Sequence, residues 1–279
     1  MKRNMFIIFG FAFFMFCSIA NAGQFIGSPE PLAKKGQLSL GAGYFYGQDT
    51  LRPEDNISLS VPGLNLVWKD IDVRQNQAFF QVHYGIARGV EIFARAGAAD
   101  LRSDDTFLFG SKFSGNFKPF GTVGVKIYSR IDETWGLGLF LQQSVYGAFT
   151  DEKTDHVSAL LPDGSIIRGI PAHRRIDIDP SWEFNAGVSL QAKTGVLKWY
   201  AGPLFYLIGA PEVRETIWIG DQRFVATPIR YTTFSTYREK NIMGGFGGVV
   251  ISFGKNITAT IEGQVKQDAS AGAVIGFAF

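Results

Sequence analysis

The feature of this sequence that most limits its fold is an alternation of apolar and polar residues with a period of two. Around residues 89–98, Val90 and Ile92 fall on one face of an extended chain, while Glu91 and Arg95 fall on the other. Successive side chains of a β-strand point to opposite faces, whereas the 3.6-residue period of a helix would mix these two sets. The pattern therefore predicts β-strands with one apolar and one polar face.

The same alternation predicts about ten strands. They lie at 37–47, 70–85, 89–100, 115–129, 134–147, 181–193, 196–208, 240–253, 256–267 and 270–279. Most of them reach the length of about 9–11 residues that a tilted membrane-spanning strand requires. After residue 22 there is no apolar run of about 18 residues, the length typical of a membrane-spanning helix. We expect an all-β chain whose residues 37–279 form one antiparallel, up-and-down transmembrane β-barrel of about ten strands, with eight or twelve as alternatives.

The connections between these strands alternate between short and long. Short turns are predicted near 86–88, 130–133, 194–195 and 254–255, and long polar loops near 48–69, 101–114, 148–180 and 209–239. Membrane barrels sort their connections in this way, with short turns on the periplasmic side and longer loops outside. In the last loop, residues 217–219 and 224–226 are joined by Gly220 and Asp221, which predicts a hairpin beyond the membrane.

The first 22 residues have the pattern of a secretory signal peptide. Lys2 and Arg3 precede a short apolar run, and Ala20 and Ala22 supply the small residues of a cleavage site after Ala22. Residues 23–36 then form a short periplasmic lead-in to the barrel. Cleavage removes two of the 27 basic residues and leaves 25, equal to the 25 acidic residues, so nothing favours nucleic acid as a partner. It also removes the only cysteine, which excludes thiol chemistry.

The final strand ends the chain on a phenylalanine. Ala271, Ala273, Ile275, Phe277 and Phe279 share one face. This resembles the C-terminal signature of Gram-negative outer-membrane β-barrel proteins. The resemblance implies that Phe277 and Phe279 form the assembly signal that the barrel-assembly machinery reads. It also implies a location in the cell outer membrane, with outer-membrane lipid and lipopolysaccharide as partners.

Aromatic side chains are expected on the outer face near the strand ends, where membrane barrels carry aromatic girdles. They are Trp135, Trp182, Trp199, Tyr44, Tyr46, Tyr84 and Phe279.

The opposite, polar face of the strands carries ionisable residues that would line the lumen. They are His83, Glu91, Arg95, Lys118, Lys126, Glu183, Lys198 and Glu262. An ionisable group inside a small barrel needs a partner or water, because burying it unpaired costs several kcal/mol. Two interpretations follow: a network of salt bridges and hydrogen bonds among these side chains that closes the barrel, or a narrow polar pathway. Bases outnumber acids in this set, so a pathway would prefer anions.

Two other functions are open. A surface-binding, adhesin-like barrel would act through its long loops. A hydrolase would resemble the omptin proteases, which carry paired aspartates and an Asp/His pair at the outer rim. Here Asp177 and Asp179 are two residues apart, so both would lie on one face of a strand. Asp155 and His156 are adjacent, however, and the family's Asp-x-His spacing is missing. A lipid A deacylase would need a His and Ser pair that we do not find. Three scattered histidines give no zinc spacing.

We therefore expect a non-enzymatic outer-membrane barrel without cofactor or metal, either structural or a narrow, porin-like conduit for small solutes.

Overall fold

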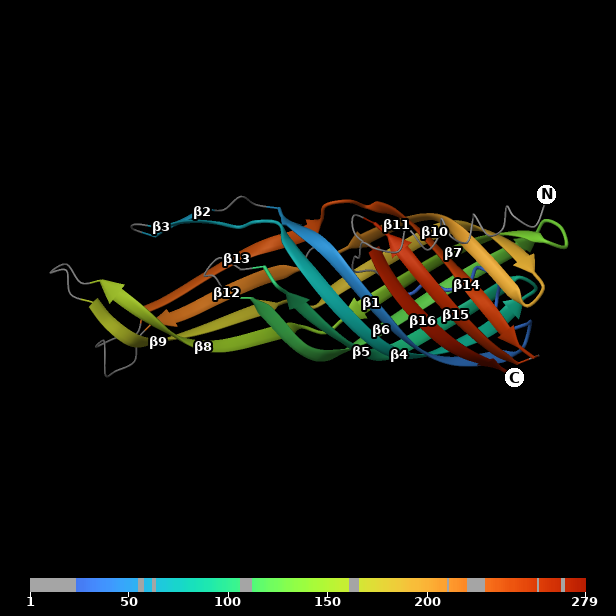
Figure 1. The fold of residues 1–279 in the computed structure, drawn as a ribbon, viewed down its shortest axis with the longest axis horizontal. Helices are drawn as coiled ribbons and strands as arrows, with labels where there is room; N and C mark the ends of the chain where they lie inside the picture. Colours follow the sequence, from blue (N-terminus) through green and yellow to red (C-terminus); the bar gives the residue numbers. More distant parts are fainter. Residues whose placement is uncertain are drawn as a thin grey trace.

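A computed structural model describes residues 24–279, except for 55–57, 62–63, 106–111, 161–165, 210, 220–228, 255 and 267–268. The signal peptide predicted at 1–22 lies outside the described residues. Ten strands form a closed antiparallel barrel (Figure 1). They are β1 (Leu38–Pro53), β4 (Ile71–Ala87), β5 (Val90–Ser103), β6 (Phe113–Arg130), β7 (Trp135–Tyr146), β10 (Ser181–Thr194), β11 (Leu197–Ile208), β14 (Met243–Phe253), β15 (Ile257–Val265) and β16 (Ala269–Ala278). Each of the ten segments predicted from the alternation corresponds to one of these strands.

The barrel closes where the last strand pairs with the first. β16 lies antiparallel to β1, with Leu40 opposite Phe277 and Tyr44 opposite Ala273. Every other strand of the barrel pairs with its predecessor and its successor in the barrel order. The wall therefore has no free edge at this level, which is the condition for a sheet to sit in lipid, because each backbone polar group finds a partner within the wall.

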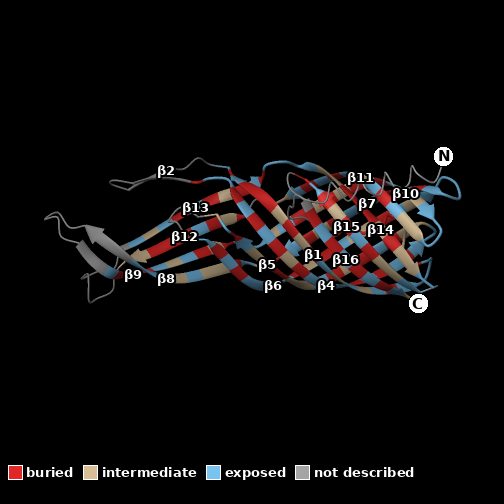
Figure 2. Ribbon diagram, in the orientation of Figure 1, coloured by how far each residue is buried: buried red, intermediate tan, exposed pale blue. Residues whose placement is uncertain are grey.

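The two faces of the wall differ in polarity as the alternation requires. In β4, Phe80, Val82 and Tyr84 are exposed, whereas Gln81 and His83 are buried. Figure 2 shows the same alternation of buried and exposed residues along the other strands. Phe80 is 75% exposed, and it is one of many large apolar side chains on the outer face. An apolar patch of this extent marks a surface that is not in water, and here it encircles a closed wall.

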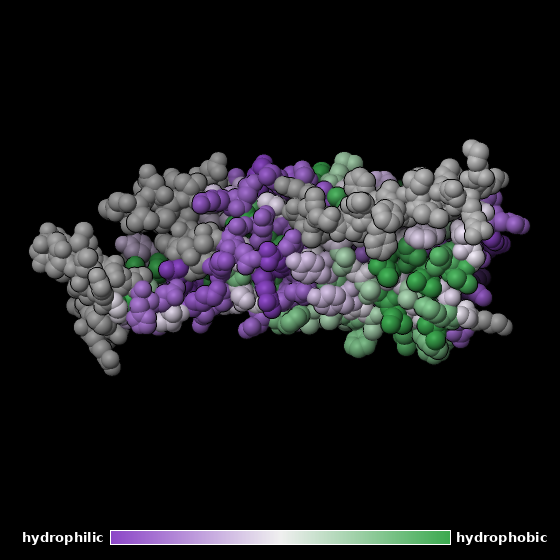
Figure 3. All heavy atoms as spheres, viewed as in Figure 1, coloured by the Kyte–Doolittle hydropathy of each residue, from purple (hydrophilic) through white to green (hydrophobic). Residues whose placement is uncertain are grey.

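The apolar belt occupies only part of the barrel's length. In Figure 3, green apolar side chains gather toward the end that holds the C-terminus, and purple polar ones cover the middle of the molecule. We call the end with Phe279 and the short turns the turn end, and the opposite one the loop end. The predicted outer aromatics Trp135, Trp182 and Tyr84 are all exposed on this face. Among the described residues, no helix is long and apolar enough to cross a membrane.

The loop end continues beyond the belt as paired strands, which we call the extension. It consists of β8 (Phe149–Leu160), β9 (Ile166–Ile178), β12 (Glu212–Ile219) and β13 (Ile229–Glu239). β9 pairs with β12, β12 with β13, and β13 with the outer part of β1. We predicted long loops at 148–180 and 209–239, but the described parts of both stretches are largely β-sheet. The β8–β9 hairpin and the β12–β13 hairpin pair with each other through β9 and β12. A separate small hairpin joins β2 (Ser58–Val61) and β3 (Leu64–Val67).

The predicted hairpin in 209–239 is confirmed in the arms that the structure describes. Its first arm is β12, and the described part of its second arm is β13, which begins at Ile229. Residues 224–226 lie outside the described residues. The last described pair of this hairpin is Ile219 opposite Ile229.

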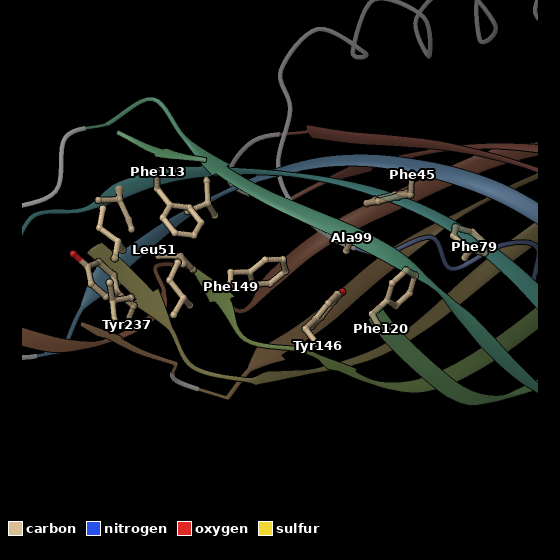
Figure 4. Close-up of a cluster of buried hydrophobic side chains, with 14 of the residues drawn as sticks. Phe45, Leu51, Phe79, Ala99, Phe113, Phe120, Tyr146, Phe149 and Tyr237 are labelled. Atoms are coloured by element: carbon tan, nitrogen blue, oxygen red, sulfur yellow. The ribbon is translucent and has the colours of Figure 1, made fainter. Parts of the chain in front are cut away.

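The interior of the barrel toward the loop end contains a cluster of apolar side chains. Figure 4 shows Leu51, Phe113, Phe149 and Tyr237 turned toward one another from four strands. All four are buried in one hydrophobic cluster. The cluster joins the extension to the outer parts of β1 and β6, so that the extension is held by packing as well as by strand pairing.

Candidate functional site in the lumen

The polar half of the lumen is occupied by the protein's own N-terminal segment. We predicted residues 23–36 as a periplasmic lead-in, but the described residues 24–29 and Ala33 are buried within the barrel. We call residues 24–33 the plug. It enters at the turn end, where Gly36 donates to the carbonyl of Gly85 at 2.7 Å, and it leads toward the loop end. A segment with no periodicity of its own is held by side chains that are far away in the sequence.

Glu262 is the main acceptor for the plug backbone. Its Oε1 accepts the backbone N–H of Ile26 at 2.8 Å, and its Oε2 accepts that of Gly27 at 2.7 Å. Tyr200 and Gln264 donate to the same two oxygens at 2.8 and 2.9 Å. Glu262 is 1% exposed, and its carboxylate receives four hydrogen bonds, which offset the cost of burying the charge.

Arg95 binds the carbonyl groups of the same turn of the plug. Its Nη1 donates to the carbonyl of Phe25, and its Nη2 to that of Ile26 at 3.3 Å. Its Nε donates to Gln81 Oε1 at 3.1 Å, and its guanidinium lies 4.7 Å from the centre of the Phe93 ring. Glu262 and Arg95 therefore clamp one peptide segment from opposite sides, one by its N–H groups and the other by its carbonyls.

A second acid, Glu91, holds the plug nearer the turn end. Its Oε2 accepts the backbone N–H of Ala33 at 2.8 Å, and its Oε1 lies 2.7 Å from Nδ1 of His83. Lys126 donates from Nζ to the carbonyl of Ser28 at 3.0 Å. His83, Glu91 and Lys126 are all at most 2% exposed. Glu91 and Lys126 contact the plug directly, and His83 contacts Glu91.

The remaining predicted lumen residues lie nearer the two ends. Lys198 forms an ion pair with Glu30 of the plug at 2.7 Å and remains partly exposed at the turn end. Glu183 is buried toward the loop end, where Tyr146 donates to it at 3.1 Å. Lys118 is half-buried in β6 and is opposite Ala99 of β5. The structure thus brings His83, Glu91, Arg95, Lys126, Lys198 and Glu262 together around the plug, while Lys118 and Glu183 lie outside its direct contacts.

Small residues make room for the plug. A Cβ atom at Gly138 of β7 would overlap the ring of Pro29, and one at Gly85 of β4 would overlap the carbonyl of Lys34. Gly138 belongs to the alternating glycines of β7, and its place opposite the plug explains why a side chain is absent there.

Three buried charged residues near the loop end are absent from the predicted set of lumen residues. Asp49 and Glu239 fall in stretches that we predicted as loops, and Lys266 ends a predicted strand. All three are buried, and Lys266 Nζ lies 3.7 Å from Glu183 Oε1. The available signal was the alternation of β1, which continues from Phe45 through Gly47 to Asp49 on the inward face.

One of the two aspartates that suggested a hydrolase, Asp177, makes structural contacts in the extension. Asp177 accepts from Arg175 at 2.7 Å and from Thr150 at 2.9 Å. Burial raises the pKa of Asp177, but the hydrogen bonds and charge of Arg175 outweigh it and hold the pKa below its ordinary value. His173 contacts Thr154 at 2.9 Å instead of a carboxylate.

In the part of the chain that the structure describes, no group of three or more His, Cys, Asp or Glu residues is arranged to hold a metal ion.

Comparisons with solved structures return membrane barrels at low sequence identity. The outer membrane protease OmpT of Escherichia coli is 13% identical over 92% of this chain and 99% of its own, with a TM-score of 0.44. The translocator domain of the autotransporter NalP of Neisseria meningitidis is 11% identical over 88% of this chain and 89% of its own, with a TM-score of 0.39. A mutant of the monoaromatic hydrocarbon channel TodX is 9% identical over 88% and 90%, with a TM-score of 0.33.

No protein-family model and no curated protein matches the sequence. The assignment rests instead on the molecule itself, whose ten-stranded wall is closed, apolar outside and polar inside. By this architecture the chain has the fold of a transmembrane β-barrel of the outer-membrane type.

Proposed function

We propose that this protein is a non-enzymatic outer-membrane barrel that its own N-terminal segment keeps closed, and that it serves as a structural support for the extension outside the cell. In this orientation the turn end faces the periplasm. Of the two interpretations of the lumen charges, we favour the closed barrel over the open, narrow pathway, with the N-terminal segment as an added part of the closure.

The observation that carries this proposal is the clamp on the plug backbone. Glu262 and Arg95 both bind the segment around Ile26, and Glu91 binds it again at Ala33. Charged wall residues of a water-filled pore would be hydrated. Here the same residues are almost fully buried and bonded to a peptide, so an ion would have to displace that peptide before it could pass.

Conductance in a planar bilayer tests the proposal. The refolded chain 23–279 should be silent, and a chain that begins at residue 35 should give reproducible discrete steps. A milder opening is Gly138→Ala, whose new methyl group overlaps Pro29. Its matched control is Gly121→Ala, because the nearest atom to a Cβ there is 3.8 Å away. Frequent steps from the intact chain, or silence from the truncated chain after verified folding, would refute the closed barrel.

The opened barrel should prefer cations, which reverses the sign expected from the sequence alone. The buried wall charges include the acids Asp49, Glu91, Glu183, Glu239 and Glu262 but only the bases Arg95, Lys126 and Lys266. The reversal potential of the truncated chain in a salt gradient measures this preference.

Binding at the cell surface is a second candidate function. The extension presents a fixed face rather than a set of separate loops, and on it the Arg230 guanidinium lies 5.3 Å from the Trp218 ring centre. The double variant Trp218→Ala, Arg230→Ala removes this pair of side chains from the β12–β13 hairpin. Adhesion of cells that display it should fall relative to the full chain, and equal adhesion would exclude this role for the pair.

A further inference from the structure

A row of four side chains crosses one face of the extension, next to the last described pair of β12 and β13. Thr154 of β8 is opposite His173 of β9. His173 is in turn opposite Trp218 of β12, which is opposite Arg230 of β13. Side chains that are directly opposite on neighbouring strands share one face of a sheet. Neighbouring strands are about 4.8 Å apart, so this tip row is about 14 Å long.

The tip row is on the accessible face of these strands. Three of its members are exposed, and Trp218 is partly exposed. The adjacent side chains Ala172 and Ile217 point to the other face and are buried. The row is therefore open to a ligand, while the opposite face of the same strands is covered.

Contacts within the row restrict its side chains. The Arg230 guanidinium lies 5.3 Å from the centre of the Trp218 ring, and Thr154 Oγ1 is 2.9 Å from Nδ1 of His173. The second contact occupies Nδ1 and leaves the Nε2 atom of the imidazole for a ligand. Side chains that are already ordered lose less conformational freedom on binding than mobile ones do.

Arg230 carries the uncompensated positive charge of the row. The other arginines of the extension whose side chains the structure describes each form an ion pair with a carboxylate. They are Arg174, Arg175, Arg214 and Arg238. Among the described residues Arg230 has no such partner, and its guanidinium contacts the Trp218 ring instead. The row therefore offers a charge that complements an anionic group of a ligand.

The surroundings of Trp218 are rich in hydroxyl groups. Thr216 and Thr232 are two residues from Trp218 and Arg230 along their strands, and their Oγ1 atoms are 3.2 Å apart. The next aromatic ring on this face of β13 is Phe234, which is four residues from Arg230, or about 13 Å along the strand. A protein partner usually needs about 800 Å² on each side and an apolar centre. One ring among hydroxyl groups supplies too little apolar surface for that.

A saccharide has the complementary surface. A sugar ring presents small patches of C–H groups between its hydroxyl groups, and such C–H groups are attracted to the electron-rich face of an aromatic ring. An acidic sugar adds a carboxylate, which a guanidinium binds through two parallel N–H···O hydrogen bonds. The tip row provides one aromatic ring, one guanidinium and polar side chains at the other end.

We propose that the tip row is a binding site for an acidic saccharide. The Arg230 guanidinium binds the sugar carboxylate, and the exposed part of the Trp218 ring packs on a C–H patch. His173 and Thr154 bind hydroxyl groups. The inference rests on the second candidate function, binding at the cell surface, and gives that function a class of ligand.

Binding of a hyaluronan hexasaccharide, which contains glucuronic acid, to the refolded chain 23–279 in detergent tests the proposal. The control ligand is the same hexasaccharide with its carboxylates reduced to alcohols. The acidic form should bind about tenfold to a hundredfold more tightly, the range that corresponds to a hydrogen bond to a charged group. Added salt should reduce this difference, because it screens exposed charges. This comparison needs no variant.

Variants locate the site. Arg230→Gln should abolish the difference in affinity between the two hexasaccharides. Its matched control is Arg238→Gln, on the same face of β13, which removes an arginine that is paired with Glu54 and should leave the difference unchanged. Trp218→Ala should weaken binding of both forms. The band shift of an unheated sample on a detergent gel verifies that each variant is folded.

The core oligosaccharide released from the lipopolysaccharide of the same cells is a second probe. Its binding to the tip row would support the proposal and place the ligand on the cell's own surface. Binding of hyaluronan alone would support it and place the ligand on another cell. Equal affinity of the wild-type chain for the acidic and reduced forms would overturn the proposal. So would equal losses in Arg230→Gln and Arg238→Gln, or no binding of either probe.

The second candidate function fails separately. Loss of adhesion in the double variant Trp218→Ala, Arg230→Ala, without binding of either saccharide to the wild-type chain, would keep surface binding but replace the saccharide by a protein partner. Unchanged adhesion of that double variant, with saccharide binding to the wild-type chain, would instead remove adhesion and keep the saccharide site.

Discussion

Replacing Glu262 with glutamine should loosen the plug more than any other single conservative change in the lumen. The two carboxyl oxygens each accept two hydrogen bonds, Oε1 from Ile26 and Gln264 and Oε2 from Gly27 and Tyr200. An amide has one oxygen, so whichever way it turns, two donors lose their acceptor and face an N–H group.

The magnitude follows from the number of bonds lost. A hydrogen bond to a charged group contributes about 1.5–3 kcal/mol, and two are lost. Removing a buried charge recovers part of that amount, because the carboxylate no longer has to be desolvated. We expect a net weakening of the closed state by about 2–5 kcal/mol, which is a rise of about 30-fold to several thousand-fold in the population with the plug displaced.

Hydrogen exchange of the refolded protein in detergent measures this population. The amides of Ile26 and Gly27 should exchange faster by that factor, while those of the wall strands stay protected. Glu133→Gln at the exposed turn is the control. Unchanged protection of the plug in a correctly folded Glu262→Gln variant would refute the argument that this carboxylate holds it.

Three further predictions concern a lumen residue, the extension and the C-terminus. His83→Ala leaves Glu91 with one fewer partner in a dry site, and should lower the temperature at which the folded gel band is lost, by the equivalent of about 1–3 kcal/mol. Asp177 has a lowered pKa, so its ionised form stabilises the extension above its ordinary titration range, and this contribution is lost as the pH falls through the lowered pKa. Pepsin should therefore cut the extension faster as the pH falls. The variant Asp177→Asn should show a weaker dependence of the cleavage rate on pH. Deleting Phe279, whose side chain is exposed at the turn end, should reduce assembly in cells while refolding into detergent persists.

The strands of the barrel wall and the faces of their side chains can be predicted from the sequence, because they depend on residues that are close together in the chain. A side chain on a strand points away from its neighbour, so lipid outside and polar contacts inside impose a period of two that any short window reveals. Val82, His83 and Tyr84 illustrate this, since their order alone assigns each to its observed face. The strand count and the inward position of Glu91, Arg95 and Glu262 follow from the same rule.

What fills and extends the barrel was decided only by tertiary structure. The plug has no periodicity, and the contact between Ile26 and Glu262 joins residues 236 positions apart. The extension forms because β9 pairs with β12, and neither hairpin's sequence indicates which strand it pairs with. Asp49 likewise becomes a lumen residue because β1 continues beyond residue 47, where it still pairs with β4 and Asp49 is opposite Val73. Alternation assigns a side chain to a face, but only the folded chain determines what that face meets.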